Sequence, residues 1–178
     1  YKVGDDLLAK TFPVYHSHHG PITHRLEGRW VATKINWDPV NALRQSFVRT
    51  KLSNHTQFRE MMDIRTNSSN NTVFADAAGN IAYYHGNFIP RRDVQFDYSK
   101  PVDGSDPRTD WSGIHEVSES ITLLNPDNGW IQNCNSTPFS AAGEFSPIRQ
   151  DYPSYMAPDP ENFRAIHAVR LLKAGSNW

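Results

Sequence analysis

Two short runs of β-favouring residues, joined by a turn of defined chemistry, constrain the fold more than any other stretch of the chain. Val73 to Ala75 and Ile81 to His85 have strand character, and Asp76 to Asn80 lies between them. An aspartate followed by Gly-Asn favours a tight reversal, because glycine and asparagine accept the left-handed backbone angles that such turns need. The stretch therefore predicts a β-hairpin, and with it a mostly antiparallel sheet.

A second segment combines a predicted strand with two carboxamides. Trp130 to Cys134 is expected to form a strand after an Asn-Pro-Asp-Asn-Gly turn. Because side chains alternate along a strand, Asn133 and Asn135 are expected on one face, with Gln132 and Cys134 on the other. A fixed asparagine can present an N–H donor where negative charge develops during acyl transfer. The alternative is that Asn, Ser, Thr and Pro merely terminate the strand.

Two helices are predicted upstream of the hairpin. Asp38 is a cap residue and the proline after it suits the first helical position, so a helix is expected over 39–50. Asn54, with Gln57 three residues later, resembles a capping box before a second short helix. Their apolar faces follow helical spacing: Val40, Leu43, Phe47 and Val48 in the first, and Phe58, Met61 and Met62 in the second.

A third helix is predicted over 160–173, after the Asp159 cap and its proline, with Ile166, Val169 and Leu172 on one face. Residues 88–112 and 139–158 lack periodicity, and both exceed the ~12–15 residues usual for a structureless connection. Such loops are expected to pack on a larger body. Further strands are expected within Thr11 to Thr23, at Trp30 to Ile35 and at Ile121 to Leu124. Antiparallel strands with flanking helices and long loops define an α+β class.

Composition argues against several classes of partner. The 178 residues include 18 basic and 19 acidic ones without a basic stripe, so nucleic acid is not expected as a partner. No apolar run approaches the ~18 residues of a membrane-spanning helix, so no membrane partner is expected either. Cys134 is the only cysteine, which excludes an internal disulfide and a cysteine-based zinc site. We expect it to be a buried, inert thiol rather than a nucleophile.

The region 70–92 and the segment around Asn135 together resemble the penicillin acylase family, the N-terminal-nucleophile amidohydrolases that include penicillin, cephalosporin, glutaryl and homoserine-lactone acylases. The likeness rests on these residues of the two motifs: Asn71, Phe74-Ala75-Asp76, Gly79-Asn80-Ile81, Tyr83, Pro90, Arg92, then Asn125-Pro126, Gly129-Trp130-Ile131, Asn133, Asn135 and Pro138. His19-Gly20-Pro21 upstream and Arg164 with Arg170-Leu171-Leu172 downstream also match. The motifs run in family order through almost the whole chain, which makes the resemblance specific.

The resemblance implies part of the four-layer αββα sandwich of N-terminal-nucleophile hydrolases. It also implies amide hydrolysis through an acyl-enzyme on a residue made N-terminal by self-cleavage. Tyr1 is not such a nucleophile, so 1–178 is expected to be one internal piece of the nucleophile-bearing β chain and not an independent complete domain. The expected partners are the α chain, the rest of the β chain and a small-molecule acyl amide.

The same resemblance assigns roles to four residues. Asn135 is expected to supply a side-chain N–H to the oxyanion hole, and Arg164 to hold the catalytic groups in place. Asn133 is expected to orient the loop, and His19 to be a structural histidine beside a glycine turn. Because the spacing from Asn135 to Arg164 is longer than in penicillin acylases proper, a surface arginine on an amphipathic helix is the alternative for Arg164.

No cofactor is expected to be required, although the resemblance makes calcium compatible with the full enzyme, without ligands assigned here. The cluster of His16, His18, His19 and His24 has neither cysteine nor carboxylate partners, and no metal site is predicted. The resemblance also implies a periplasmic or secreted location. The alternative function is a non-catalytic, β-rich binding module that retains only the scaffold, but the order of the motifs favours the amidohydrolase.

Overall fold

The computed structural model describes residues 1–67 and 70–175. The chain divides into two compact units, the first spanning Tyr1–Ile35 and the second beginning at Asn36. Each unit is considered by itself. Among the described residues, no helix has the length and apolar character needed to cross a membrane.

The first unit is built from short antiparallel strands. β1 (Lys2–Val3) pairs with β2 (Asp6–Leu7), and a separate sheet has the order β3 (His16–Ser17), β4 (Gly20–Leu26), β5 (Arg29–Ala32). The strand predicted to reach Ile35 therefore ends at Ala32. Gly20 adopts a φ of 128°, and a Cβ there would lie 2.3 Å from the carbonyl oxygen of Thr33, so only glycine fits this close approach.

The second unit contains the predicted hairpin. β6 (Asn71–Ala75) and β7 (Ile81–His85) pair antiparallel, and β8 (Thr122–Leu124) pairs antiparallel with the other edge of β7. In the turn, Asp76 Oδ1 accepts hydrogen bonds from the backbone amides of Ala78 and Asn80. The Asn80 side chain donates to the same carboxylate, and these bonds hold the pKa of Asp76 below its ordinary value. The hairpin prediction is confirmed.

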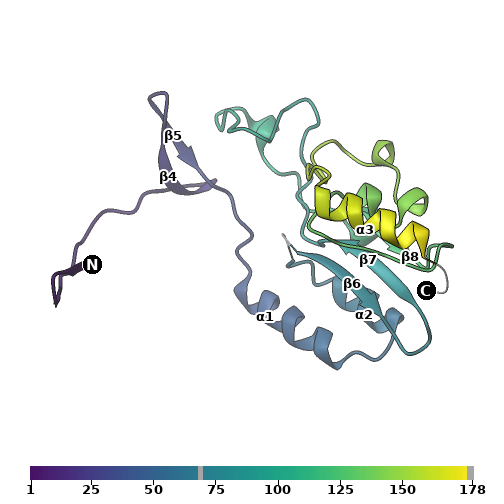
Figure 1. The fold of residues 1–178 in the computed structure, drawn as a ribbon. Coiled ribbons are helices and arrows are strands. Elements are labelled where there is room, and N and C mark those ends of the chain that lie inside the picture. Colours follow the sequence, from purple (N-terminus) through teal and green to yellow (C-terminus); the bar gives the residue numbers. More distant parts are fainter. Residues whose placement is uncertain (68–69, 176–178) are drawn as a thin grey trace. The chain divides into compact units, whose positions relative to one another are not determined.

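Helices lie on both sides of this sheet (Figure 1). α1 (Pro39–Val48) and α2 (His55–Met62) lie on one side, and α3 (Phe163–Ala174) lies on the other. α2 buries Phe58 and Met62 in a cluster with Ala82, Tyr84 and Val117. A second cluster combines Ile89, Ile121, Met156 and Ala157. Tyr83, Tyr84 and Trp130 are buried, as expected for core aromatics.

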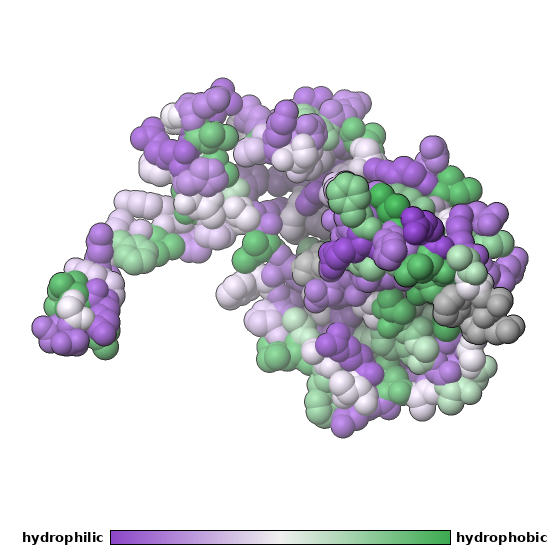
Figure 2. All heavy atoms as spheres, viewed as in Figure 1, coloured by the Kyte–Doolittle hydropathy of each residue, from purple (hydrophilic) through white to green (hydrophobic). Residues whose placement is uncertain are grey.

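The caps of the first two helices were predicted correctly, with one difference. Asp38 Oδ1 accepts from the amide of Asn41, and Asn54 Oδ1 accepts from the amide of Gln57. The side-chain oxygen of Gln57 accepts a hydrogen bond from the backbone amide of Ser53 rather than from that of Asn54, so the capping box is incomplete. Most of the apolar face of α1 is exposed, with Val40, Leu43 and Phe47 between 65% and 75% accessible, whereas Val48 packs against the core cluster. Over α1, Figure 2 shows hydrophobic and hydrophilic residues next to one another on the surface.

The predicted strand from Trp130 to Cys134 is wrong. The pairing of β8 ends at Leu124, where the Asn125 side chain accepts from the amide of Ile81 and donates to the side chain of Asn80. Residues 130–134 pair with neither edge of the sheet. The segment instead packs against the following loop, and the amide of Gln132 donates to the carbonyl of Ala141 at 2.7 Å.

The start and the buried face of the third helix also differ from the prediction. α3 begins at Phe163 with Asn162 as its N-cap, three residues later than the predicted cap at Asp159. Its fully buried residue is Ala165, whereas Ile166 is exposed. The two long loops are irregular, as predicted. The short 3₁₀ turns of the chain are Arg49–Lys51, Pro107–Thr109, Val117–Glu119, Pro138–Ser140, Gly143–Phe145 and Arg149–Asp151.

Candidate active site

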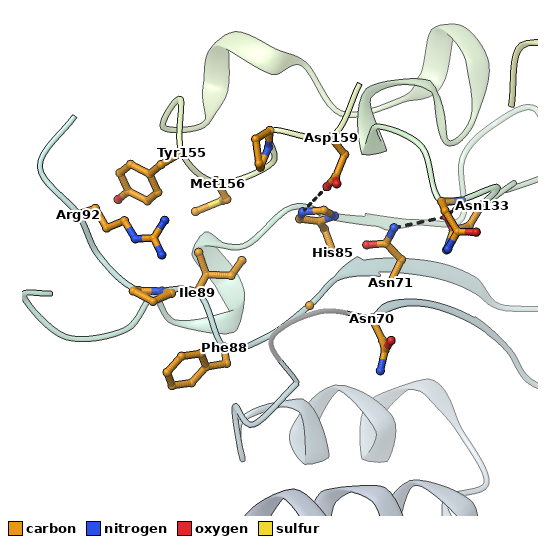
Figure 3. Close-up of a pocket in the computed structure, with 14 residues that line it drawn as sticks. Asn70, Asn71, His85, Phe88, Ile89, Arg92, Asn133, Tyr155, Met156 and Asp159 are labelled. Atoms are coloured by element: carbon orange, nitrogen blue, oxygen red, sulfur yellow. Dashed lines mark hydrogen bonds and ion pairs between the residues drawn. The ribbon is translucent and has the colours of Figure 1, made fainter. Parts of the chain in front are cut away.

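A cavity of about 480 Å³ lies where the sheet meets three loops of the second unit (Figure 3). Asn133 lies on one side of the cavity, and Arg92 and Tyr155 lie on the opposite side. The complete lining is Asn70, Asn71, His85, Gly86, Phe88, Ile89, Pro90, Arg92, Asn133, Asn135, Tyr155, Met156, Pro158 and Asp159. Both predicted carboxamides therefore face one cavity, although the chain between them is not a strand.

The loop that carries Asn135 is held by side chains. Asn135 has a φ of 56°, in the left-handed region that asparagine tolerates better than most residues. Its backbone amide donates to Asn133 Oδ1 at 3.0 Å, and Asn71 Nδ2 of β6 donates to the same oxygen at 3.4 Å. Asn133 thus lies where it can orient the loop, as the sequence predicts.

Arg164 lies in the first turn of α3 and reaches this loop. Its Nη2 donates to Asn135 Oδ1 at 3.3 Å. A guanidinium only donates hydrogen bonds, so this contact assigns the oxygen end of the Asn135 amide to the arginine. The NH₂ end of the same amide remains as a donor. The structure therefore brings together Asn133, Asn135 and Arg164, three of the four residues that the sequence singled out.

Asn162 also contacts this loop, and the sequence analysis missed it. Its Nδ2 donates to the backbone carbonyls of Cys134 and Asn135, both at 3.1 Å. Its Oδ1 accepts from the amide of Ala165 at 3.1 Å and caps α3. The available signal was an asparagine two residues before Arg164, which is a standard cap position once the helix start is placed at Phe163.

A partly buried histidine lines the cavity near the centre of Figure 3. His85 Nε2 lies 3.7 Å from Asp159 Oδ2, and the Tyr83 hydroxyl lies 3.4 Å from His85 Nδ1. Burial lowers the pKa of His85, and the charge of Asp159 offsets part of that shift. Burial likewise raises the pKa of Tyr83 above its ordinary value. At neutral pH this group therefore consists of a neutral imidazole and a neutral phenol beside a carboxylate.

Arg92 brings a positive charge to the far side of the cavity. Its guanidinium carbon lies 5.1 Å from the centre of the Tyr98 ring. Its Nε is buried without a hydrogen-bond partner among the residues that the structure describes. Burial lowers the pKa of this guanidinium, which nevertheless stays protonated.

The remaining predicted residues lie elsewhere or contribute no ligand set. His19 belongs to the first unit, in the turn between β3 and β4, where its backbone amide donates to Ser17 Oγ. Its structural role stays a prediction. Cys134 is partly buried in the loop. Within the described residues from 36 to 175, no three His, Cys, Asp or Glu side chains converge as ligands for an ion.

The fold of the chain is similar to that of a solved penicillin G acylase. The thermostable penicillin G acylase from Alcaligenes faecalis superimposes with a TM-score of 0.72 and 24% identity, over 91% of this chain and 28% of that one. At this identity the likeness establishes the fold, an α+β part of the nucleophile-hydrolase sandwich.

The sequence comparisons define the family more narrowly. The penicillin amidase profile matches residues 1–178, and the chain belongs to this family. Penicillin G acylase from Escherichia coli is 28% identical over 150 residues, which cover 82% of this chain. The chain spans only 16% of the length of that relative.

Proposed function

We propose that this chain is part of an acylase that hydrolyses the amide bond of an N-acylated small molecule of the penicillin, glutaryl or acyl-homoserine-lactone type. The nucleophile is a Ser on another part of the protein, made N-terminal by self-processing, and its own α-amino group serves as the base. An acyl-enzyme forms as the amine leaves, and water then hydrolyses it. This chain contributes electrostatic stabilisation of the tetrahedral intermediate.

The hydrogen bond from Arg164 to Asn135 carries this proposal. With the Asn135 oxygen assigned to the guanidinium, the NH₂ group of the amide is the end that a substrate carbonyl oxygen can approach in the cavity. Attack on the carbonyl carbon converts this oxygen to an oxyanion. A donor that strengthens its hydrogen bond as that charge develops lowers the barrier rather than the ground state.

The proposed partners are the other parts of the same processed precursor, an α chain and the remainder of the β chain. Two observations support this proposal. The chain covers 28% of the penicillin G acylase structure that it superimposes on. The apolar side of α1 is exposed at Val40, Leu43 and Phe47, and an amphipathic helix ordinarily buries such a side. A calcium ion elsewhere in the full enzyme and a periplasmic or secreted location complete the proposal, testable by metal analysis and cell fractionation.

The decisive variant is Asn135→Ala in the full, processed enzyme. Loss of one oxyanion donor is expected to lower kcat by ~10²–10³-fold and to change KM far less, because the donor acts mainly in the transition state. Asn135→Asp is expected to be at least as harmful, since a carboxylate repels the developing charge. Steady-state kinetics on phenylacetyl, glutaryl and long-chain acyl amides provide the measurement.

The processed state must be checked first by mass spectrometry of the chains, because self-cleavage passes through an oxyanion of its own. A correctly processed Asn135→Ala enzyme with near-normal kcat would show that Asn135 only shapes the loop. It would remove the basis for the proposed role of this chain.

A further inference from the structure

We propose that Asn162 is a positioning residue for catalysis, which locks the loop carrying Asn135 to the start of α3. This inference rests on the proposed function, because it gives Asn162 its importance through Asn135. Nothing in the family likeness or in the sequence patterns assigned this residue a role. Three hydrogen bonds of one side chain carry the argument.

The Asn162 amide is used at both ends. Its oxygen accepts from the amide of Ala165, and its NH₂ group donates to the carbonyls of Cys134 and Asn135. A carboxamide offers two N–H donors and an acceptor oxygen, so both donors and the acceptor are engaged. A helix cap needs only the oxygen. The two donor contacts are therefore in excess of the capping role.

The loop needs this support because no strand pairing holds it. Asn135 adopts a left-handed backbone conformation, with its amide bonded to the Asn133 side chain and its carbonyl to Asn162. Both sides of the residue are thus fixed by side chains. Arg164, two residues after Asn162, fixes the Asn135 side chain itself. The first turn of α3 therefore sets the position of both the backbone and the amide of Asn135.

Catalysis is sensitive to such placement, because a displacement of about 1 Å can cost ~10²-fold in rate. Loss of the Asn162 donors would leave the Asn135 amide present but free to move relative to the reacting carbonyl. The expected signature is a fall in kcat with little change in KM. A purely structural cap would instead alter stability and leave the kcat of the folded enzyme near normal.

The test compares Asn162→Asp with Asn54→Asp in the full, processed enzyme. Aspartate caps a helix as well as asparagine does, so both variants keep the cap. Asn162→Asp also removes two donors and places a carboxylate near two carbonyl oxygens. We expect kcat to fall ~10–100-fold for Asn162→Asp, with KM within about twofold, and both constants to stay within about twofold for Asn54→Asp. Should Asn162→Asp fail to fold or to process, Asn162→Ser removes the donors without a charge and keeps a capping oxygen.

A double variant distinguishes positioning from general damage. If Asn162 acts through Asn135, Asn162→Asp adds little further loss of kcat in an Asn135→Ala enzyme, because the donor is already absent. Losses that multiply fully, or a kcat within about twofold of normal for the folded single variants at Asn162, would overturn the inference. Asn135→Ala by itself tests the proposed function. A large effect there with none at Asn162 rejects only the positioning role.

Discussion

α2 and α3 each begin at an asparagine N-cap, but the two helices are held in place differently. Asn54 and Asn162 each accept a hydrogen bond from the amide three residues later, at 3.0 and 3.1 Å. α2 then buries Phe58, Met61 and Met62, whereas the only fully buried residue among the described part of α3 is Ala165. α2 is held by packing, and α3 is tied to its surroundings by polar contacts at its start.

Each helix start also contacts β7 through a titratable side chain. His55 Nε2, in the first residue of α2, lies 2.7 Å from the Tyr84 hydroxyl. Asp159, three residues before the cap of α3, lies 3.7 Å from His85. Tyr84 and His85 are consecutive and point to opposite faces of the sheet, as strand alternation requires. One face of β7 therefore packs in the core, and the other face lies toward the polar cavity.

The largest expected effect tests the packing side of this comparison. Phe58→Ala should lower the free energy of unfolding by ~3–5 kcal/mol, because Phe58 is buried and packs on Phe74, with the centres of the two rings 4.7 Å apart. The matched change in α3, Ile166→Ala at an exposed position, should cost no more than ~0.5 kcal/mol. Urea unfolding followed by circular dichroism measures both. Equal losses would contradict the view that only α2 is held by packing.

The second effect concerns the two caps. Asn54→Ala should cost about 1 kcal/mol of unfolding free energy, the typical value of a lost cap. Asn162→Ala should cost about 2 kcal/mol, because two further hydrogen bonds to loop carbonyls disappear with the cap. The difference between these variants in thermal or urea unfolding measures the loop contacts. If Asn162→Ala lowers the unfolding free energy no more than Asn54→Ala does, the loop holds its conformation without the Asn162 hydrogen bonds.

The smallest effect is a pH dependence on the cavity side. Burial keeps the pKa of His85 below its ordinary value of 6.5, so the folded state binds fewer protons than the unfolded state just below that pH. The contribution of His85 to stability is therefore complete above about pH 6.5 and declines as the pH falls below it. His85→Gln should flatten this decline relative to wild type. Asp159→Asn should steepen it, because the opposing charge is removed. Unfolding at about pH 5 and 7.5 provides the test, and an unchanged slope in both variants would exclude His85 as its source.

The sequence correctly predicted the turns and helix caps that depend on contacts between neighbouring residues. The hairpin turn at Asp76 and the caps at Asp38 and Asn54 depend on residues within four positions of one another, so they were read correctly. The error at 130–134 has a different origin. That run packs against the following loop, where Gln132 donates hydrogen bonds to the backbone carbonyls of Ser140 and Ala141. Residue patterns alone do not record such contacts.

The candidate site shows the same division. The family motifs pointed to Asn133, Asn135 and Arg164, which meet in the structure. Asn162 was missed because its partners lie 27 and 28 residues upstream, and because Asp159 and its proline offered a more familiar helix start. The exposure of the apolar side of α1 could not be predicted either, because an amphipathic pattern indicates a side that is buried but not which part of the protein covers it.

The backbone of Asn135 restricts which residues evolution could place there. At a φ of 56°, glycine, asparagine and aspartate are the residues that pay the least strain. The oxyanion role proposed for Asn135 adds a requirement for a neutral N–H donor, which removes glycine, because it has no side chain, and aspartate, because it is charged. Asparagine alone satisfies both conditions, so the loop geometry and the proposed chemistry favour the same residue for independent reasons. No substitution at this position is therefore conservative unless the backbone conformation of the loop changes first.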